Sequence, residues 1–226
     1  PFGIPLSEKL LETGARLIHS ETELNQQDYN SAPPVSSDTI KEINAWRRIF
    51  FMLDLIGQDP ARYGGFGYGN VSCRLKHNKE AFLITGTQTG HLPDLGPEHY
   101  TTVTTCDPDR NHIVASGPVK PSSEALTHGA LYRVDQSIQF VFHVHCPEIW
   151  NNAASMGLTI TDANIQYGTP EMAQEFERII YVKEVQQRPI IVMGGHEDGV
   201  VTYGASAEHA GSLLVNYFSQ SLQIIL

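Results

Sequence analysis

Two histidines separated by a single residue are the sharpest chemical feature of this sequence. His143 and His145 lie in segment 138–145, whose alternating pattern and β-branched and aromatic residues predict a strand. Side chains at positions i and i+2 of a strand share one face, so the two imidazoles lie within about 7 Å of each other. Two ligands of one metal ion require that proximity. For an isolated pair, the more common explanation is two histidines on a half-exposed strand.

A third histidine and a glutamate could complete a catalytic metal site. His196 lies in a glycine-rich turn between two predicted strands, and catalytic zinc usually has three protein ligands and one open position. Glu124 follows Ser122 and Ser123 at the start of a predicted helix, where free backbone N–H groups and the helix dipole favour an anion. Taken singly, His196 is more simply explained by a surface turn and Glu124 by a helix cap.

Two glycine motifs at strand boundaries could let the backbone approach a phosphate. Gly69-Asn70 comes directly before a predicted strand, and Thr85-Gly86 ends another. Glycine-rich loops allow backbone N–H groups to approach an anion closely. The first motif leads into a strand and not into a helix, so a dinucleotide-binding fold is disfavoured. Either pair alone is more typical of a tight turn.

The composition excludes several classes of protein. Hydrophobic residues make up 41% of the 226 residues and charged residues 18%, which is enough apolar material for a real core. The formal net charge of −10 argues against a general nucleic-acid or anionic-membrane binder, which would carry a basic surface. No apolar stretch approaches the roughly 20 residues that span a bilayer. Since the sequence begins with Pro1 and not Met, we expect the natural chain to start further upstream.

The three cysteines indicate a reducing environment. Cys73, Cys106 and Cys146 are too few and too scattered for a disulfide framework, which favours a cytoplasmic location. Cys146 directly follows His145, but on an ideal strand it points to the opposite face. We therefore assign its thiol to the core and not to the metal.

The elements that must position these residues alternate between helices and strands. Helices are predicted at residues 6–19, 38–53, 121–133, 147–156, 170–185 and 205–226, and strands at 71–75, 81–85, 103–106, 112–115, 138–145, 189–193 and 200–203. The polar stretch 21–37 contains Pro33-Pro34 and is interpreted as a linker or surface loop. The chain therefore divides into an N-terminal extension, residues 1–37, and one α/β domain, residues 38–226, in which helices cover a mainly antiparallel sheet.

In their order along the chain, these motifs resemble the class II aldolase/adducin family. The resemblance runs over about residues 40–218. Its motifs are Gly69-Asn70-Val71-Ser72, Ile84-Thr85-Gly86, Pro121-Ser122-Ser123-Glu124 with His128 and Tyr132, His143-Val144-His145, and His196 ahead of Val200-Val201 and Gly204. The sequence departs from the family pattern at two places. Glu197 and Asp198 intervene between His196 and the next glycine, and the loop 87–91 replaces a shorter serine-glycine form.

The resemblance implies a fold, a cofactor and a set of site residues. The expected fold has three layers, with a central, mainly antiparallel sheet flanked by helices. Zn²⁺ or another divalent transition metal would bind His143, His145 and His196, and Glu124 would be the catalytic acid/base. The positions that hold phosphate in the family's sugar-phosphate aldolases correspond to Asn70, Thr85, Gly86, Ser122 and Ser123. Family enzymes are commonly homotetramers of carbohydrate metabolism with active sites at subunit interfaces.

The activity implied by the resemblance is that of a metal-dependent lyase. Its substrate would be a small carbonyl compound, a hydroxy-ketone that is phosphorylated or not, cleaved or formed through a metal-stabilised enediolate. A dehydratase or decarboxylase of the same family and a non-catalytic, adducin-like module are the alternatives. The second proton donor would be a tyrosine, and the sequence does not separate Tyr167, Tyr181 and Tyr203. Lys120 and Arg74 are candidates for holding an anion, although either could be a solvated surface charge.

Overall fold

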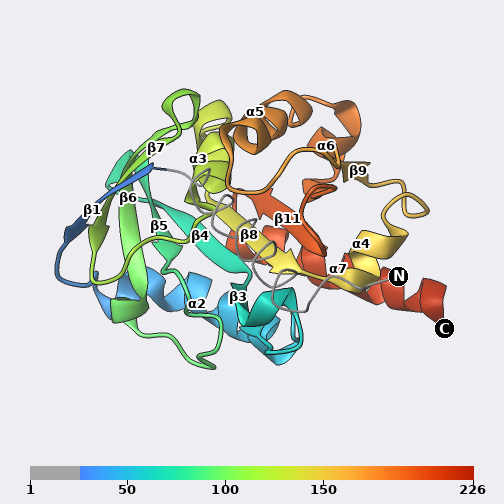
Figure 1. The fold of residues 1–226 in the computed structure, drawn as a ribbon, viewed down its shortest axis with the longest axis horizontal. Helices are drawn as coiled ribbons and strands as arrows, with labels where there is room; N and C mark the ends of the chain where they lie inside the picture. Colours follow the sequence, from blue (N-terminus) through green and yellow to red (C-terminus); the bar gives the residue numbers. More distant parts are fainter. Residues whose placement is uncertain (1–25) are drawn as a thin grey trace, which may run out of the picture.

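A nine-stranded sheet forms the middle layer of the molecule, and helices cover both of its faces (Figure 1). The computed structural model describes residues 26–226. The strand order is β1-β7-β6-β5-β4-β8-β11-β10-β9. Neighbouring strands are antiparallel except for the outermost pairs, β1 with β7 and β9 with β10, which are parallel. The predicted three-layer α/β fold with a mainly antiparallel central sheet is therefore confirmed.

The strands are β1 (Gln26–Ser31), β2 (Gly57–Gln58), β3 (Gly67–Tyr68), β4 (Asn70–Leu75), β5 (Asn78–Thr85), β6 (Tyr100–Asp107), β7 (His112–Gly117), β8 (Phe140–His145), β9 (Thr159–Ile160), β10 (Ile190–Val192) and β11 (Gly199–Gly204). The helices are α2 (Ser37–Met52), α3 (Ala125–Val134), α4 (Pro147–Asn152), α5 (Pro170–Ile179), α6 (Lys183–Gln187) and α7 (Ala207–Ile225). Within residues 26–226, no helix is long and apolar enough to cross a membrane.

Alternation along β8 shows how the sheet joins two apolar cores. Phe142 and Val144 pack on the side of α2, α4 and α7, whereas Val141 packs on the side of α3 and α5. Successive side chains of a strand point to opposite faces, so a central strand covered on both sides must be apolar on both. His143 and His145 share a face with Val141, and they occupy the end of that face next to the pocket.

The N-terminal stretch differs from its prediction. Residues 26–31, expected in a linker or surface loop, form β1 and pair in parallel with β7. An edge strand is held by backbone hydrogen bonds on one side only, so it tolerates polar side chains such as Asp28 and Asn30, which are exposed. The helix predicted at residues 6–19 lies outside the described residues, and the domain boundary at residue 37 stays a prediction.

Two backbone segments close to the sheet, residues 63–69 and loop 87–90, form part of the wall of the pocket described below. The ribbon β2–β3 packs on loop 87–90 so closely that a Cβ at Gly90 would lie 2.1 Å from the Gly57 carbonyl oxygen. Gly69, between β3 and β4, has φ +74, a left-handed conformation that glycine adopts at little cost. These glycines allow segment 63–69 to fold back over the ends of β4 and β8.

Candidate metal centre

Strand pairing brings the three predicted ligands together. β8 pairs with β11 so that His145 lies opposite Gly199, and His143 lies opposite Val201. His196 stands three residues before Gly199 in a tight turn, in which the Gly199 N–H donates to the His196 carbonyl at 2.9 Å. Because antiparallel partners face each other directly, this turn places His196 beside the end of β8.

The imidazoles converge closely enough to share one ion. Nε2 of His145 lies 3.1 Å from Nε2 of His196, and one ring nitrogen from each histidine lies within 4.8 Å of the others. Two nitrogens at 2.0–2.1 Å from a tetrahedral Zn²⁺ would be about 3.3 Å apart, so the donor set and its spacing fit a divalent metal. His143 and His145 are 1% and 3% exposed. Metal binding by these residues stays a prediction.

Glu124 lies directly beside the three histidines. It is the N-cap residue of α3, which begins at Ala125, so it stands just before the helix and not in its first turn. Its Oε1 lies 3.0 Å from His196 Nε2, and its Oε2 contacts His143 Nδ1. The Asn70 amide donates to Oε2 at 3.2 Å. One carboxylate thus joins α3, β4, β8 and the His196 turn.

The charge state of Glu124 follows from two opposing effects. Burial alone would raise the pKa of this carboxyl, which is 4% exposed. The adjacent imidazoles of His143 and His196 outweigh burial and hold the pKa well below its usual range. The side chain is therefore a carboxylate at neutral pH and can accept a proton from a bound molecule.

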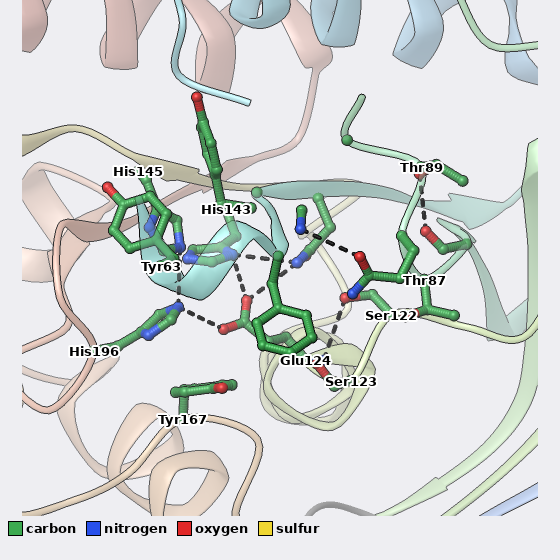
Figure 2. Close-up of a pocket in the computed structure, with 18 residues that line it drawn as sticks. Tyr63, Thr87, Thr89, Ser122, Ser123, Glu124, His143, His145, Tyr167 and His196 are labelled. Atoms are coloured by element: carbon green, nitrogen blue, oxygen red, sulfur yellow. Dashed lines mark hydrogen bonds and ion pairs between the residues drawn. The ribbon is translucent and has the colours of Figure 1, made fainter. Parts of the chain in front are cut away.

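A cavity of about 280 Å³ opens over the histidines and the carboxylate. Figure 2 shows His145, His196, Tyr63 and Tyr167 on one side of Glu124, with Thr87, Thr89 and Ser122 on the other. The lining residues are Tyr63, Phe66, Gly67, Tyr68, Gly69, Asn70, Gly86, Thr87, Gln88, Thr89, Gly90, Ser122, Ser123, Glu124, His143, His145, Tyr167 and His196. The cavity is of the size that holds a small metabolite.

The structure brings four of the five predicted phosphate positions to this cavity. Asn70, Gly86, Ser122 and Ser123 line it, but Thr85 does not. The Thr85 hydroxyl instead accepts a hydrogen bond from the Val71 N–H at 3.2 Å, inside the sheet. The threonines that do reach the cavity, Thr87 and Thr89, were missed from the sequence. The only indication in the sequence was that the loop 87–91, which contains both threonines, departs from the family pattern. This part of the cavity wall is therefore expected to differ from that of the family.

The structure separates the three candidate tyrosines. The Tyr167 ring lies 4.1 Å from the His196 ring, centroid to centroid, and lines the cavity. Tyr181 is 64% exposed, and Tyr203 is buried in the core under α3 and α5, so neither lines it. Tyr63 and Tyr68 also line the cavity and were not predicted, although both stand in the glycine-rich run 63–69 that the sequence marks as irregular.

Neither candidate cation holds a place in the cavity wall. Arg74 is buried and donates to the backbone carbonyls of Ile138 at 3.0 Å and Tyr132 at 2.7 Å, so it stabilises the chain between α3 and β8. Lys120 is exposed and lies outside the lining residues. Anionic groups in this cavity would therefore meet hydroxyl, amide and backbone donors.

Cys146 lies in the core as the sequence predicts, and His128, a member of the family motif, is also buried. The Cys146 thiol is buried among the apolar residues on the side of α2, α4 and α7, away from the histidine cluster. His128, one turn after Glu124 on α3, is completely buried and its Nδ1 lies 2.7 Å from the Ser72 hydroxyl. Burial lowers the pKa of His128 to about 3, so this imidazole is neutral.

Comparison with known proteins identifies a sequence family and a fold. The sequence model of the class II aldolase and adducin N-terminal domain matches residues 61–218. No curated protein sequence matches the chain. Several solved structures are similar to this chain, and three of them are described next.

YgbL from Escherichia coli, for which aldolase, epimerase and decarboxylase activities have been suggested, is 20% identical with a TM-score of 0.60, over 84% of this chain and 89% of YgbL. An L-fuculose-1-phosphate aldolase from Thermus thermophilus is 19% identical with a TM-score of 0.55, over 80% and 89% of the two chains. A sugar-phosphate aldolase from Thermotoga maritima is 15% identical with a TM-score of 0.60, over 83% and 95%. At these identities the likeness shows a shared fold.

Proposed function

The chain belongs to the class II aldolase and adducin family, and from that premise we propose that it is a metal-dependent lyase. Its reaction would be the cleavage or formation of a carbon–carbon bond in a hydroxy-ketone. One observation carries the proposal: three histidine nitrogens and one buried carboxylate converge on the wall of a single small-molecule cavity. A domain of residues 38–226 would carry this activity, with residues 1–37 as an extension.

His143, His145 and His196 would hold the divalent ion, Zn²⁺ or another transition metal. When bound, such an ion acts as a Lewis acid that stabilises the negative charge developing on substrate oxygens. Two ligands come from β8 and the third from the tight turn that leads into its partner β11, so backbone pairing would set their positions before the ion arrives. The buried surroundings strengthen the electrostatic interactions with the developing charge.

Glu124 would move the proton that the reaction displaces. Its carboxylate is ionised and lies at the cavity wall, with Oε2 held by the Asn70 amide. It would accept a proton from the hydroxyl or carbon next to the substrate carbonyl and return it later in the cycle. Of the three candidate tyrosines, only Tyr167 lines the cavity, where its ring lies beside that of His196. It would donate a proton to the departing carbonyl fragment.

The opposite wall would bind the polar end of the substrate. Asn70, Gly86, Ser122 and Ser123, the predicted phosphate positions that line the cavity, would contribute there, together with Thr87 and Thr89. Hydroxyl and backbone N–H donors bind either a phosphate or a sugar hydroxyl. Assays with phosphorylated and unphosphorylated hydroxy-ketones would show which kind of substrate the enzyme uses. Assembly into a homotetramer, a role in carbohydrate metabolism and a cytoplasmic location remain predictions from the family.

A dehydratase or a decarboxylase is the second candidate. Both reactions begin with the same charge development next to a carbonyl, and the same carboxylate and histidines would serve them. The suggested activities of YgbL, a similar structure, include decarboxylation. Assays of the metal-loaded protein should therefore follow aldehyde, water-loss products and carbon dioxide separately. A non-catalytic module is disfavoured, because all three histidines and Glu124 are present and assembled.

Glu124→Gln tests the proposal. The amide keeps the size of the side chain but cannot exchange the proton, so metal content should stay at one ion per chain. Turnover should fall by about 10²–10⁴-fold, the usual contribution of a positioned acid/base. Glu197→Gln, a change at an exposed glutamate next to His196, is the matched control and should retain activity. Full turnover in the Glu124 variant would remove this residue from the mechanism, and absence of metal in the unmodified protein would overturn the metal site.

A further inference from the structure

The two residues that depart from the family pattern, Glu197 and Asp198, have different environments. Glu197 is exposed, whereas Asp198 is half-buried and its backbone carbonyl is hydrogen-bonded to the residue that follows β8. The Cys146 N–H donates to the Asp198 carbonyl at 2.8 Å, directly after His145. Asp198 has φ +61, a left-handed conformation that aspartate tolerates better than most residues. Asp198 therefore ties the His196 turn to the residue that follows His145, whereas Glu197 takes no part in this contact.

The Asp198 side chain contacts Tyr63, a lining residue on the same side of the cavity as His145 and His196 (Figure 2). The Tyr63 hydroxyl donates to Asp198 Oδ2 at 2.5 Å, and Arg62 Nη2 donates to the Tyr63 oxygen at 3.0 Å. Tyr63 has φ +48, which is unfavourable for a bulky residue, so its contacts must offset a backbone cost.

The ring that Asp198 holds packs against a predicted metal ligand. The Tyr63 and His145 rings meet edge to face, with 4.4 Å between their centroids and 69° between their planes. The Tyr68 ring lies 5.4 Å from the same imidazole. Both tyrosines are under Arg62, whose guanidinium stacks on each ring and pairs with Asp54 at 2.7 Å. The wall around His145 is therefore aromatic and fixed by charged groups.

The environment of His145 makes this wall important. Metal-bound histidines are usually oriented by a hydrogen bond from the second ring nitrogen to a carboxylate or carbonyl. His145 Nδ1 is buried and makes no hydrogen bond to any residue between 26 and 226. Nε2, the nitrogen nearest His196, faces the centre. The imidazole direction is therefore set by packing against the Tyr63 and Tyr68 rings and not by a hydrogen bond at Nδ1.

We propose that Asp198 and Tyr63 form a brace that orients His145 and holds the His196 turn against it. Both are positioning residues: Asp198 acts on His145 through the Tyr63 ring, and on His196 through the backbone of its own turn. The brace rests on the proposed metal site and extends it, since it assigns a role to the inserted residue. Its effect is on metal affinity and ligand geometry, before any substrate is present.

The test compares variants that break the brace without straining the backbone. Asp198→Gly removes the carboxylate and tolerates φ +61, and Asp198→Asn restores an acceptor of the same shape. Tyr63→Phe keeps the ring and removes the hydroxyl. Glu197→Gly, in the same turn, is the matched control, because it removes an equal charge from an exposed position. Each variant is studied as the full chain.

Three readouts separate the brace from general stability. They are Zn²⁺ affinity by competition with a chromophoric chelator, the visible absorption of the Co²⁺-loaded protein, and thermal unfolding in excess EDTA. Asp198→Gly and Tyr63→Phe should weaken Zn²⁺ binding by about 10–100-fold, as loss of an outer-sphere orienting contact does. Their Co²⁺ spectra should change, and the double variant should be no weaker than either single one. Asp198→Asn should recover most of the affinity.

Each opposite result has a distinct meaning. Wild-type affinity and spectra in Asp198→Gly would overturn the brace while leaving the metal site intact. Lower thermal stability in EDTA with unchanged affinity would show a structural role only, and would also overturn it. A loss in Glu197→Gly equal to that in Asp198→Gly would assign the effect to charge and not to the contact with Tyr63. Failure of the unmodified protein to bind Zn²⁺ or Co²⁺ would instead overturn the proposed function.

Discussion

Acid should destabilise this protein partly through one buried imidazole on α3. His128 is completely buried with its Nδ1 on Ser72, and burial lowers its pKa to about 3. In the unfolded chain an imidazole titrates near about 6.5. Below that pH the imidazole is protonated in the unfolded state but stays neutral in the folded state. The free energy of unfolding therefore falls as the pH drops from about 6.5 toward about 3. The contribution of neutral His128 to stability is complete only above that pH range.

The size of the effect follows from the two pKa values. One proton of difference changes the free energy of unfolding by about 1.4 kcal/mol per pH unit. Between pH 7 and pH 5 the contribution of His128 comes to about 2 kcal/mol, and the full interval down to about pH 3 gives about 5 kcal/mol. That is a large share of the 5–15 kcal/mol that stabilises a typical domain, so the effect is measurable.

Urea unfolding at pH 7 and pH 5 measures this contribution. EDTA is present at both pH values, so that proton competition for metal ligands does not enter. His128→Asn replaces the titrating ring with a neutral amide near the Nδ1 position and lowers stability at both pH values, because it leaves a cavity. The difference between the two pH values should nevertheless be smaller than in the unmodified protein by about 2 kcal/mol. An unchanged difference would refute the buried, neutral state of His128.

Three further results are expected. Zn²⁺ in excess should raise the melting temperature of the unmodified protein, since a ligand that binds only the folded state stabilises it, and His196→Ala should abolish that shift; an equal shift in the variant would exclude His196 as a ligand. Cys146→Ser should keep one metal ion per chain, because the thiol packs in the core on the opposite face of β8 from the histidines; loss of metal from a folded variant would contradict this. Tyr167→Phe should lower turnover of the metal-loaded enzyme by about 10²-fold, whereas exposed Tyr181→Phe should leave it unchanged; equal turnover in both would exclude Tyr167 as the proton donor.

Features set by local geometry could be predicted from the sequence. The shared face of His143 and His145 follows from strand periodicity alone, without knowledge of any tertiary contact. The three- and four-residue spacing of Ile40, Ile43 and Phe50 predicts one apolar helix face for the same reason, and all three are buried on α2. The order of the motifs along the chain then supplied His196 and Glu124, whose spacing alone favoured ordinary turn and cap roles.

Features set by tertiary contacts could not be predicted. The resemblance placed Thr85 among the phosphate positions, but the hydrogen bond from the Val71 N–H holds its hydroxyl inside the sheet, whereas Thr87 lines the cavity. Tyr63 reaches the cavity only because glycines at positive φ turn segment 63–69 back over β8, and Asp198 meets it from 135 residues away. Strand β1 was hidden because an edge strand does not need the apolar alternation that reveals central strands.

The pairing of β8 with β11 also determines when the site can exist during synthesis of the chain. His145 leaves the ribosome 51 residues before His196, and β11 and α7 follow later still. Until His196 and β11 are made, the growing chain carries two of the three predicted ligands, and the central strand β8 has one partner missing. A nascent or truncated chain that ends before about residue 200 should therefore hold metal weakly and expose apolar surface to chaperones. Completion of about the last eighth of the chain joins folding of the sheet and assembly of the metal centre into a single late event.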